Sequence, residues 1–99
     1  MKTHEVIVHE LAQETLKKLF LKDKKSFNKI SIALDELEKK GLKASSIKKL
    51  SSTNKIFRKR VGRFRILFTV NLKTFNVWII AIEKDTKKDY KVWIKYITN

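Results

Sequence analysis

The sequence has 99 residues, which is the length of one domain with a single hydrophobic core. Hydrophobic residues make up 42% of it, enough apolar material to fold, and this excludes a disordered polycation. There is no cysteine, which excludes disulfides, cysteine-based zinc sites and a thiol nucleophile. Lys and Arg number 24 against 10 Asp and Glu, so the formal net charge is +14 and the expected partner is an anion.

The first residues are too charged for a signal peptide, and every apolar run is much shorter than a membrane span. We therefore expect a cytoplasmic protein, and we expect neither a metal ion nor another cofactor. The first element along the chain is a strand over residues 3–9, because polar and apolar side chains alternate around Val6 and Val8.

Two helices are predicted next. From Glu10 the apolar residues fall at helical spacing, and residues 22–24 interrupt that pattern. A second helix begins near Ser26 and repeats apolar residues at three- and four-residue steps until Gly41, which occupies the position of a left-handed C-cap. The two helices form a helical hairpin, and the short polar residues of 42–54 predict a connecting loop.

The second half of the chain predicts strands. Residues 55–61 and 63–70 flank Gly62 and predict two antiparallel strands joined by a tight turn. Residues 71–74 form the next turn, and 75–82 are apolar on both faces, as is typical of a central strand. A short terminal helix is predicted from the apolar face shared by Tyr90, Trp93, Ile94 and Ile97.

Together these elements predict one α+β domain over residues 1–99. The order is strand, helix, helix, strand, strand, strand, helix. This order predicts an antiparallel four-stranded sheet with the helical hairpin packed on one face and a short carboxyl-terminal helix. The other face of the sheet is left partly open.

The arginines mark the candidate site. No Asp or Glu occurs between Glu38 and Glu83, and all four arginines, Arg58, Arg60, Arg63 and Arg65, fall within eight residues. The planar guanidinium group carries a fork of donors suited to phosphate. Strand alternation places Arg58, Arg60 and Arg65 on the open face of the sheet, where we expect the three groups to converge on one patch. Like charges on neighbouring strands lower stability, which favours a functional role for them.

Lys59 does not fit this pattern, because alternation directs its side chain toward the helices. Either the side chain extends past the edge of the sheet, or the strand is bulged at this position.

The segment IFRKRVGRFRILFTV followed by VWIIAIEKDTKKDY resembles the central signature of RelE-type toxins of the RelE/ParE superfamily. The resemblance is specific in the carboxyl-terminal half of the chain, and the amino-terminal half agrees only in the order of its elements. It implies the toxin of a type II toxin–antitoxin system, a ribosome-dependent endoribonuclease that cuts messenger RNA in the ribosomal A site. Its partner would be an acidic cognate antitoxin.

The resemblance also implies roles for single residues. Arg58 and Arg60 stand where RelE has two catalytic lysines, and Arg65 matches an arginine that stabilises the transition state. Lys84 stands at the position of a second catalytic arginine, and Tyr90 matches a carboxyl-terminal tyrosine. Nearby cations are expected to contact RNA, namely Lys55, Lys59, Arg63, Lys87 and Lys88.

The departures from the RelE type bear on the mechanism. The implied reaction is attack of a ribose 2′-hydroxyl on the adjacent phosphate, which needs an acid, a base and cations around the phosphorane. Arginine does not readily give up its proton, so Arg58 is a poor general base. We therefore expect Arg60 and Arg65 to stabilise charge while ribosomal groups and water move the protons.

Two other functions fit the same sequence. One is a ParE-like, non-enzymatic inhibitor of DNA gyrase, and the other is a plain basic module that binds nucleic acid. Structural roles also fit several residues: Tyr90 as a helix-packing residue and Lys84 as a solvated charge. We expect His4 and His9 at the surface, and Trp78 and Trp93 in the core rather than stacked on bases.

Overall fold

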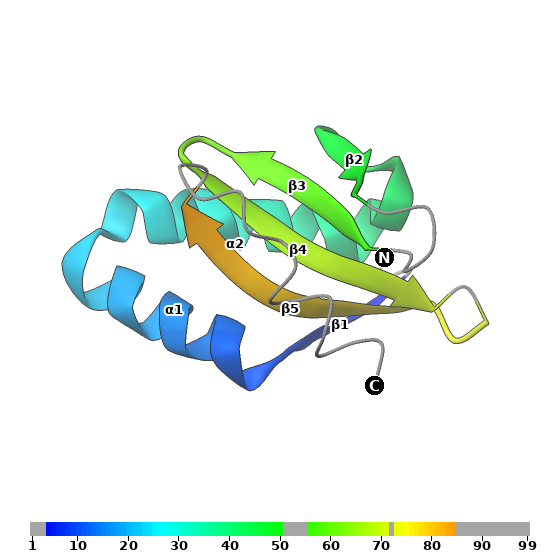
Figure 1. The fold of residues 1–99 in the computed structure, drawn as a ribbon, viewed down its shortest axis with the longest axis horizontal. Coiled ribbons are helices and arrows are strands. Elements are labelled where there is room, and N and C mark those ends of the chain that lie inside the picture. Colours follow the sequence, from blue (N-terminus) through cyan, green and yellow to red (C-terminus); the bar gives the residue numbers. More distant parts are fainter. Residues whose placement is uncertain (1–3, 51–55, 72, 85–99) are drawn as a thin grey trace.

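The computed structural model describes residues 4–50, 56–71 and 73–84. Figure 1 shows a helical hairpin lying against one face of a twisted sheet. Within these ranges, no helix is long and apolar enough to cross a lipid bilayer. The elements are β1 (Glu5–Val8), α1 (Glu10–Lys22), α2 (Lys24–Lys40), the 3-10 turn η1 (Gly41–Lys43), β2 (Ile47–Lys49), β3 (Phe57–Val61), β4 (Phe64–Asn71) and β5 (Asn76–Lys84).

The two helices follow the predicted pattern, and a single residue separates them. Asp23 accepts a hydrogen bond at Oδ1 from the backbone N of Ser26 (3.2 Å) and one at Oδ2 from the Ser26 hydroxyl (2.7 Å), so it caps the start of α2. At the start of α1, Nδ1 of His9 accepts a hydrogen bond from the backbone N of Leu11 (3.3 Å). Of the two caps, the one at Asp23 lies at the reversal between the helices.

The sheet differs from the prediction in two ways. It has five strands in the order β1-β5-β4-β3-β2, and β1 pairs with β5 in parallel, so the sheet is mixed and not purely antiparallel. Alternation identifies β1 as a strand but says nothing of its direction, which the helical hairpin between β1 and the rest of the sheet determines. The other difference is β2, which lies in the region predicted as a loop and pairs with β3. Three residues are too few for alternation to mark a strand.

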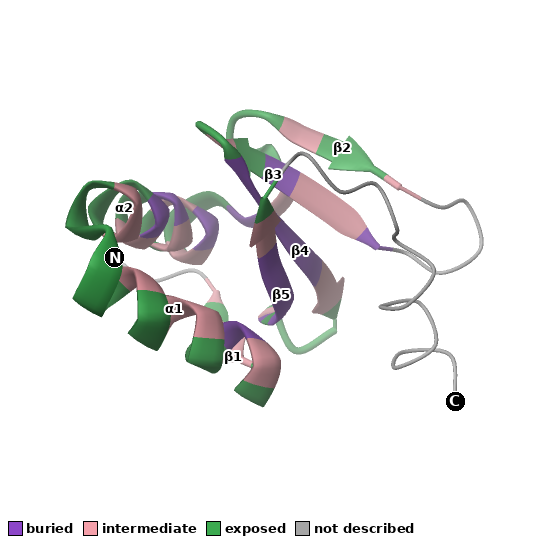
Figure 2. Ribbon diagram, turned by 60° about the vertical axis from the view of Figure 1, so that its left-hand side comes forward, coloured by how far each residue is buried: buried purple, intermediate pink, exposed green. Residues whose placement is uncertain are grey.

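The main core lies between the helices and the sheet. Its buried residues include Ala12, Ile30, Ala33 and Leu37 from the helices and Phe64, Ile66, Phe68, Val77, Ile79 and Ile82 from the strands. Figure 2 shows that the buried positions concentrate in β4, β5 and the side of α2 that faces the sheet. A smaller cluster of Ile56, Leu67, Ile80 and Ala81 forms on the other face. β5 is therefore apolar on both faces, as predicted. A β-bulge in β5 places Ile80 on the same face as Ala81, the face that the helices do not cover.

The two glycines lie where the backbone needs a positive φ, as the sequence predicts. Gly62 (φ 58°) lies in the β3–β4 turn, and Gly41 (φ 55°) ends α2. A Cβ on Gly41 would lie 2.6 Å from Cε1 of His4. His4 also makes an edge-on contact with Phe75, with 5.8 Å between the ring centroids. His4 is thus half-buried, not the surface residue that was predicted, whereas His9 is exposed as expected.

The tryptophan prediction is wrong for Trp78. Its side chain is 43% exposed, because it lies on the face of β5 opposite Val77 and Ile79, which fill the main core. Trp93 and the predicted carboxyl-terminal helix lie outside the described residues.

Candidate nucleic-acid interface

The β3–β4 hairpin places three arginines on the face of the sheet that the helices do not cover. Arg58 pairs with Leu67 and Arg60 pairs with Arg65. Directly paired residues in an antiparallel sheet point to the same side, and Leu67 belongs to the cluster on the helix-free face. Arg58, Arg60 and Arg65 therefore share that face, as alternation predicts. We call these three residues, together with Lys48, the basic face.

Lys48 joins the basic face through β2. It is exposed and pairs with Arg58 across the β2–β3 ladder. Its side chain therefore lies on the same side of the sheet as the arginines. Sequence reasoning missed this lysine because it missed the strand that carries it.

Arg65 is not an exposed cation. It is fully buried, its Nε donates a hydrogen bond to Oε1 of Glu83 (2.8 Å), and its Nη2 lies 2.7 Å from the same oxygen in an ion pair. Arg65 and Glu83 are paired residues of β4 and β5, so Arg60, Arg65 and Glu83 form a row across three strands. The prediction that three guanidinium groups converge on one exposed patch is therefore wrong for Arg65, because its side chain is buried and its charge is offset by the carboxylate of Glu83.

Glu83 is the functional candidate that sequence reasoning overlooked. It is the first carboxylate after Glu38, and that signal was visible in the sequence. What the sequence lacked was the register that places Glu83 opposite Arg65. A buried arginine with a close carboxylate is held in one position, so the Arg65–Glu83 pair has a fixed geometry next to the exposed Arg60.

Lys59 points into the protein, and neither of the two explanations for it applies. Its side chain is 4% exposed, and Nζ lies 2.7 Å from Oε1 of Glu36 and 2.6 Å from the carbonyl oxygen of Ser45, to which it donates. The hydrogen bond from Lys59, with a second from the backbone of Ser45, lowers the pKa of Glu36 to about 2. Lys59 is therefore buried in an ion pair between the sheet and α2. RNA cannot reach a side chain in this position, so the structure does not support the RNA contact predicted for Lys59.

Lys84 lies on the other side of the sheet from Arg58, Arg60 and Arg65. It pairs with Phe64, a residue of the main core, so it points to the helix-covered side of the sheet, opposite to Glu83. It lines an open cleft together with Arg63 of the β3–β4 turn. The remaining predicted site residues lie outside the described residues, namely Lys55, Lys87, Lys88 and Tyr90.

Comparison with solved structures identifies the fold. No family sequence model matches the chain, and no curated protein matches it by sequence. The RelE–RelB complex from Pyrococcus horikoshii matches with a TM-score of 0.73 and 22% identity, over 87% of this chain and 99% of RelE. A mutant of Escherichia coli RelE in the free state matches with a TM-score of 0.75 and 17% identity, over 98% and 99% of the two chains. The chain has the RelE/YoeB toxin fold.

A YoeB structure supports the same assignment. In the YoeB–YefM complex from Staphylococcus aureus, YoeB matches with a TM-score of 0.67 and 23% identity, over 81% of this chain and 94% of YoeB. At these identities the likeness concerns the fold, so chemistry has to be argued from the side chains of this chain.

On this RelE/YoeB fold, the basic face offers cations and one carboxylate but no described imidazole. His9 caps α1 and His4 packs against Gly41, so both described histidines lie elsewhere. Arginine stays protonated at all physiological pH values, which makes it a stabiliser of negative charge and not a proton carrier. The described part of the face is therefore equipped to bind phosphate and to stabilise charge that develops on it.

Proposed function

We propose that this protein is the toxin of a type II toxin–antitoxin system and that it cuts messenger RNA on the ribosome. The observation that carries the proposal is the basic face itself. Lys48, Arg58 and Arg60 lie on the helix-free side of a RelE/YoeB fold, beside an arginine that Glu83 holds in place. Such an arrangement binds an RNA backbone and concentrates positive charge next to it.

The reaction is an intramolecular attack within the RNA. The 2′-oxygen of one ribose forms a bond to the adjacent phosphorus, the bond from phosphorus to the 5′-oxygen breaks, and the products are a 2′,3′-cyclic phosphate and a 5′-hydroxyl. Arg60, with Arg58 beside it, binds the non-bridging oxygens and stabilises the charge of the phosphorane. Arg65 is a positioning residue, because its guanidinium group is buried against Glu83. Ribosomal groups and water move the protons, since arginine does not.

A dedicated protein partner is part of the proposal. The homologous RelE of P. horikoshii was crystallised with RelB, and the YoeB of S. aureus with YefM. With a formal charge of +14, this chain would be bound most readily by an acidic antitoxin.

Expression in a bacterial host tests the proposal. We expect growth arrest together with new 5′ ends inside coding sequences. The Arg60→Ala substitution should lower cleavage by about 10²-fold, the effect of removing one charge-stabilising contact. Lys73→Ala is the matched control, because Lys73 is an exposed cation in the β4–β5 turn. It should cleave like the wild type.

Other outcomes would overturn the proposal. Intact transcripts with a DNA-damage response would indicate the ParE-like inhibition of gyrase. Intact transcripts without toxicity would indicate a plain nucleic-acid-binding module.

A further inference from the structure

A second basic surface lies on the other side of the sheet from the basic face. It is an open cleft of about 870 Å³ at the end of the molecule where α2 begins, β3 turns into β4 and β5 ends. Figure 1 shows these three segments at the same end. The residues that line it include Asp23, Lys25, Lys29, Arg63, Phe64 and Lys84.

The charges in this cleft are not balanced. Four exposed cations, Lys25, Lys29, Arg63 and Lys84, surround a single carboxylate, Asp23. None of the four side chains makes an ion pair or hydrogen bond with another described residue. Asp23 already accepts two hydrogen bonds from Ser26, which are the main cause of its lowered pKa, and the charges of Lys29 and Lys84 lower that pKa further without a direct contact. The cleft therefore has an excess of positive charge that an anion would neutralise.

The cleft is distinct from the basic face because strand alternation separates them. Glu83, Arg65 and Arg60 form one row across the sheet and point to the helix-free side. Lys84, Phe64 and Val61 form the next row and point to the helix-covered side. Arg63 lies in the turn between these two surfaces.

We propose that this cleft is a second binding site for the phosphate backbone of RNA, and that it holds RNA outside the segment that crosses the basic face. The choice of RNA rests on the proposed function. The cations come from a helix, a turn and a strand, so they are spread around an open cleft as successive phosphates require. Lysine suits this role as a point charge for phosphate.

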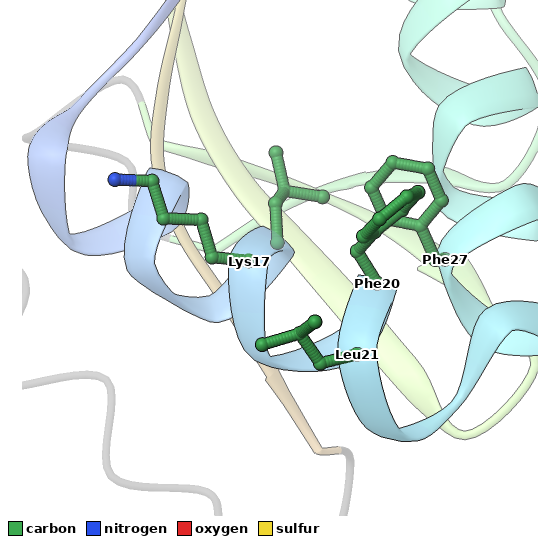
Figure 3. A pocket seen from close by; sticks show the side chains of 5 residues that line it. Lys17, Phe20, Leu21 and Phe27 are labelled. Carbon is green, nitrogen blue, oxygen red and sulfur yellow. The ribbon is translucent and has the colours of Figure 1, made fainter.

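An acidic protein is the competing ligand, and the lining of the cleft favours it less. Phe64 is buried and Val61 is half-buried, and none of the large exposed apolar side chains of the described residues lines the cleft, so a protein partner would find no large apolar side chain to pack against there. Exposed apolar side chains occur instead on α1, where Phe20 and Leu21, with Leu16 of α1 and Phe27 of α2, line a separate hollow (Figure 3).

The test compares two triple variants of the full chain. The cleft variant carries Lys25→Gln, Lys29→Gln and Lys84→Gln. The control carries Lys18→Gln, Lys40→Gln and Lys73→Gln, which removes the same charge from exposed positions outside the cleft. Binding of a labelled single-stranded RNA, without ribosomes, is measured by fluorescence anisotropy over a range of salt concentrations. Thermal unfolding of both variants checks that they are folded.

We expect the cleft variant to bind this RNA about tenfold more weakly near physiological salt. The slope of log K against log salt should fall by about 2, because each lost contact to a single strand contributes about 0.7. The control should keep the wild-type slope.

Equal slopes for the two variants would overturn the proposal. So would a cleft variant that loses binding to polyglutamate while its RNA binding is unchanged, which would assign the cleft to an acidic protein. Because the assay contains no ribosome, cleft-dependent RNA binding by a chain that cuts no transcript would refute the proposed endoribonuclease and leave this inference intact.

Discussion

Two buried ion pairs determine how single residues act in this protein. Lys59 pairs with Glu36 on the helix-covered side of the sheet, and Arg65 pairs with Glu83 on the other side. Removing one partner of such a pair leaves a buried charge uncompensated, which typically costs about 3–5 kcal/mol. The sequence indicates the direction of each side chain but not its partner, because Lys59 and Glu36 lie on separate elements.

The Lys59–Glu36 pair makes stability depend on pH. The pKa of Glu36 falls from 4.5 to about 2 on folding, so its contribution is complete above 4.5 and is lost as the pH falls toward 2. We expect Glu36→Gln to lower the free energy of unfolding by about 3 kcal/mol at neutral pH. The difference in free energy of unfolding between variant and wild type should become small as the pH falls toward 2. Urea unfolding at several pH values measures this, and a gap that does not change with pH would contradict it.

For the Arg65–Glu83 pair, we expect a single substitution to lower the free energy of unfolding more than a double substitution does. Glu83→Gln should lower the free energy of unfolding by about 3–5 kcal/mol, since the buried Arg65 loses its counter-charge. Arg65→Met combined with Glu83→Gln should recover much of this loss, because no buried charge remains. Urea unfolding of the three proteins tests the prediction, which fails if the double variant is the least stable.

At the scale of elements, the sequence predicted what is locally determined. The helices begin and end within about two residues of the predicted positions, because apolar spacing, Asp23 and Gly41 specify them. The β3–β4 hairpin and the face that carries Arg58 and Arg60 also follow from alternation around Gly62. The parallel pairing of β1 depends on contacts between distant segments, and β2 is too short to show a period, so neither could be predicted.

The end of α2 provides a test at the same scale. At Gly41 an added Cβ would meet the ring of His4, whereas at Gly62 nothing lies within 4 Å. Both residues have a positive φ, which disfavours an L-residue at either position. Gly41→Ala should therefore destabilise the protein clearly more than Gly62→Ala does. Urea unfolding compares them, and equal losses would show that the contact with His4 is unimportant.

At the scale of the whole molecule, the sheet separates two basic surfaces. The basic face lies on the helix-free side, and the cleft of Lys25, Lys29, Arg63 and Lys84 lies on the helix-covered side. The sequence suggested one site because Lys84 and Arg65 both matched RelE-type positions. Only the register shows that Lys84 and Glu83 point in opposite directions. Part of the positive charge of the chain is therefore gathered on two separate surfaces, which we propose bind different parts of one RNA.

The most direct test of the central claim is cleavage of messenger RNA by the purified chain. Labelled messenger RNA is incubated with the protein, with and without ribosomes that hold the RNA in the A site. We predict cleavage only when ribosomes are present, and a loss of about 10²-fold or more when Arg58 and Arg60 are both replaced by alanine. Intact ribosome-bound RNA in the presence of folded wild-type protein would contradict the account.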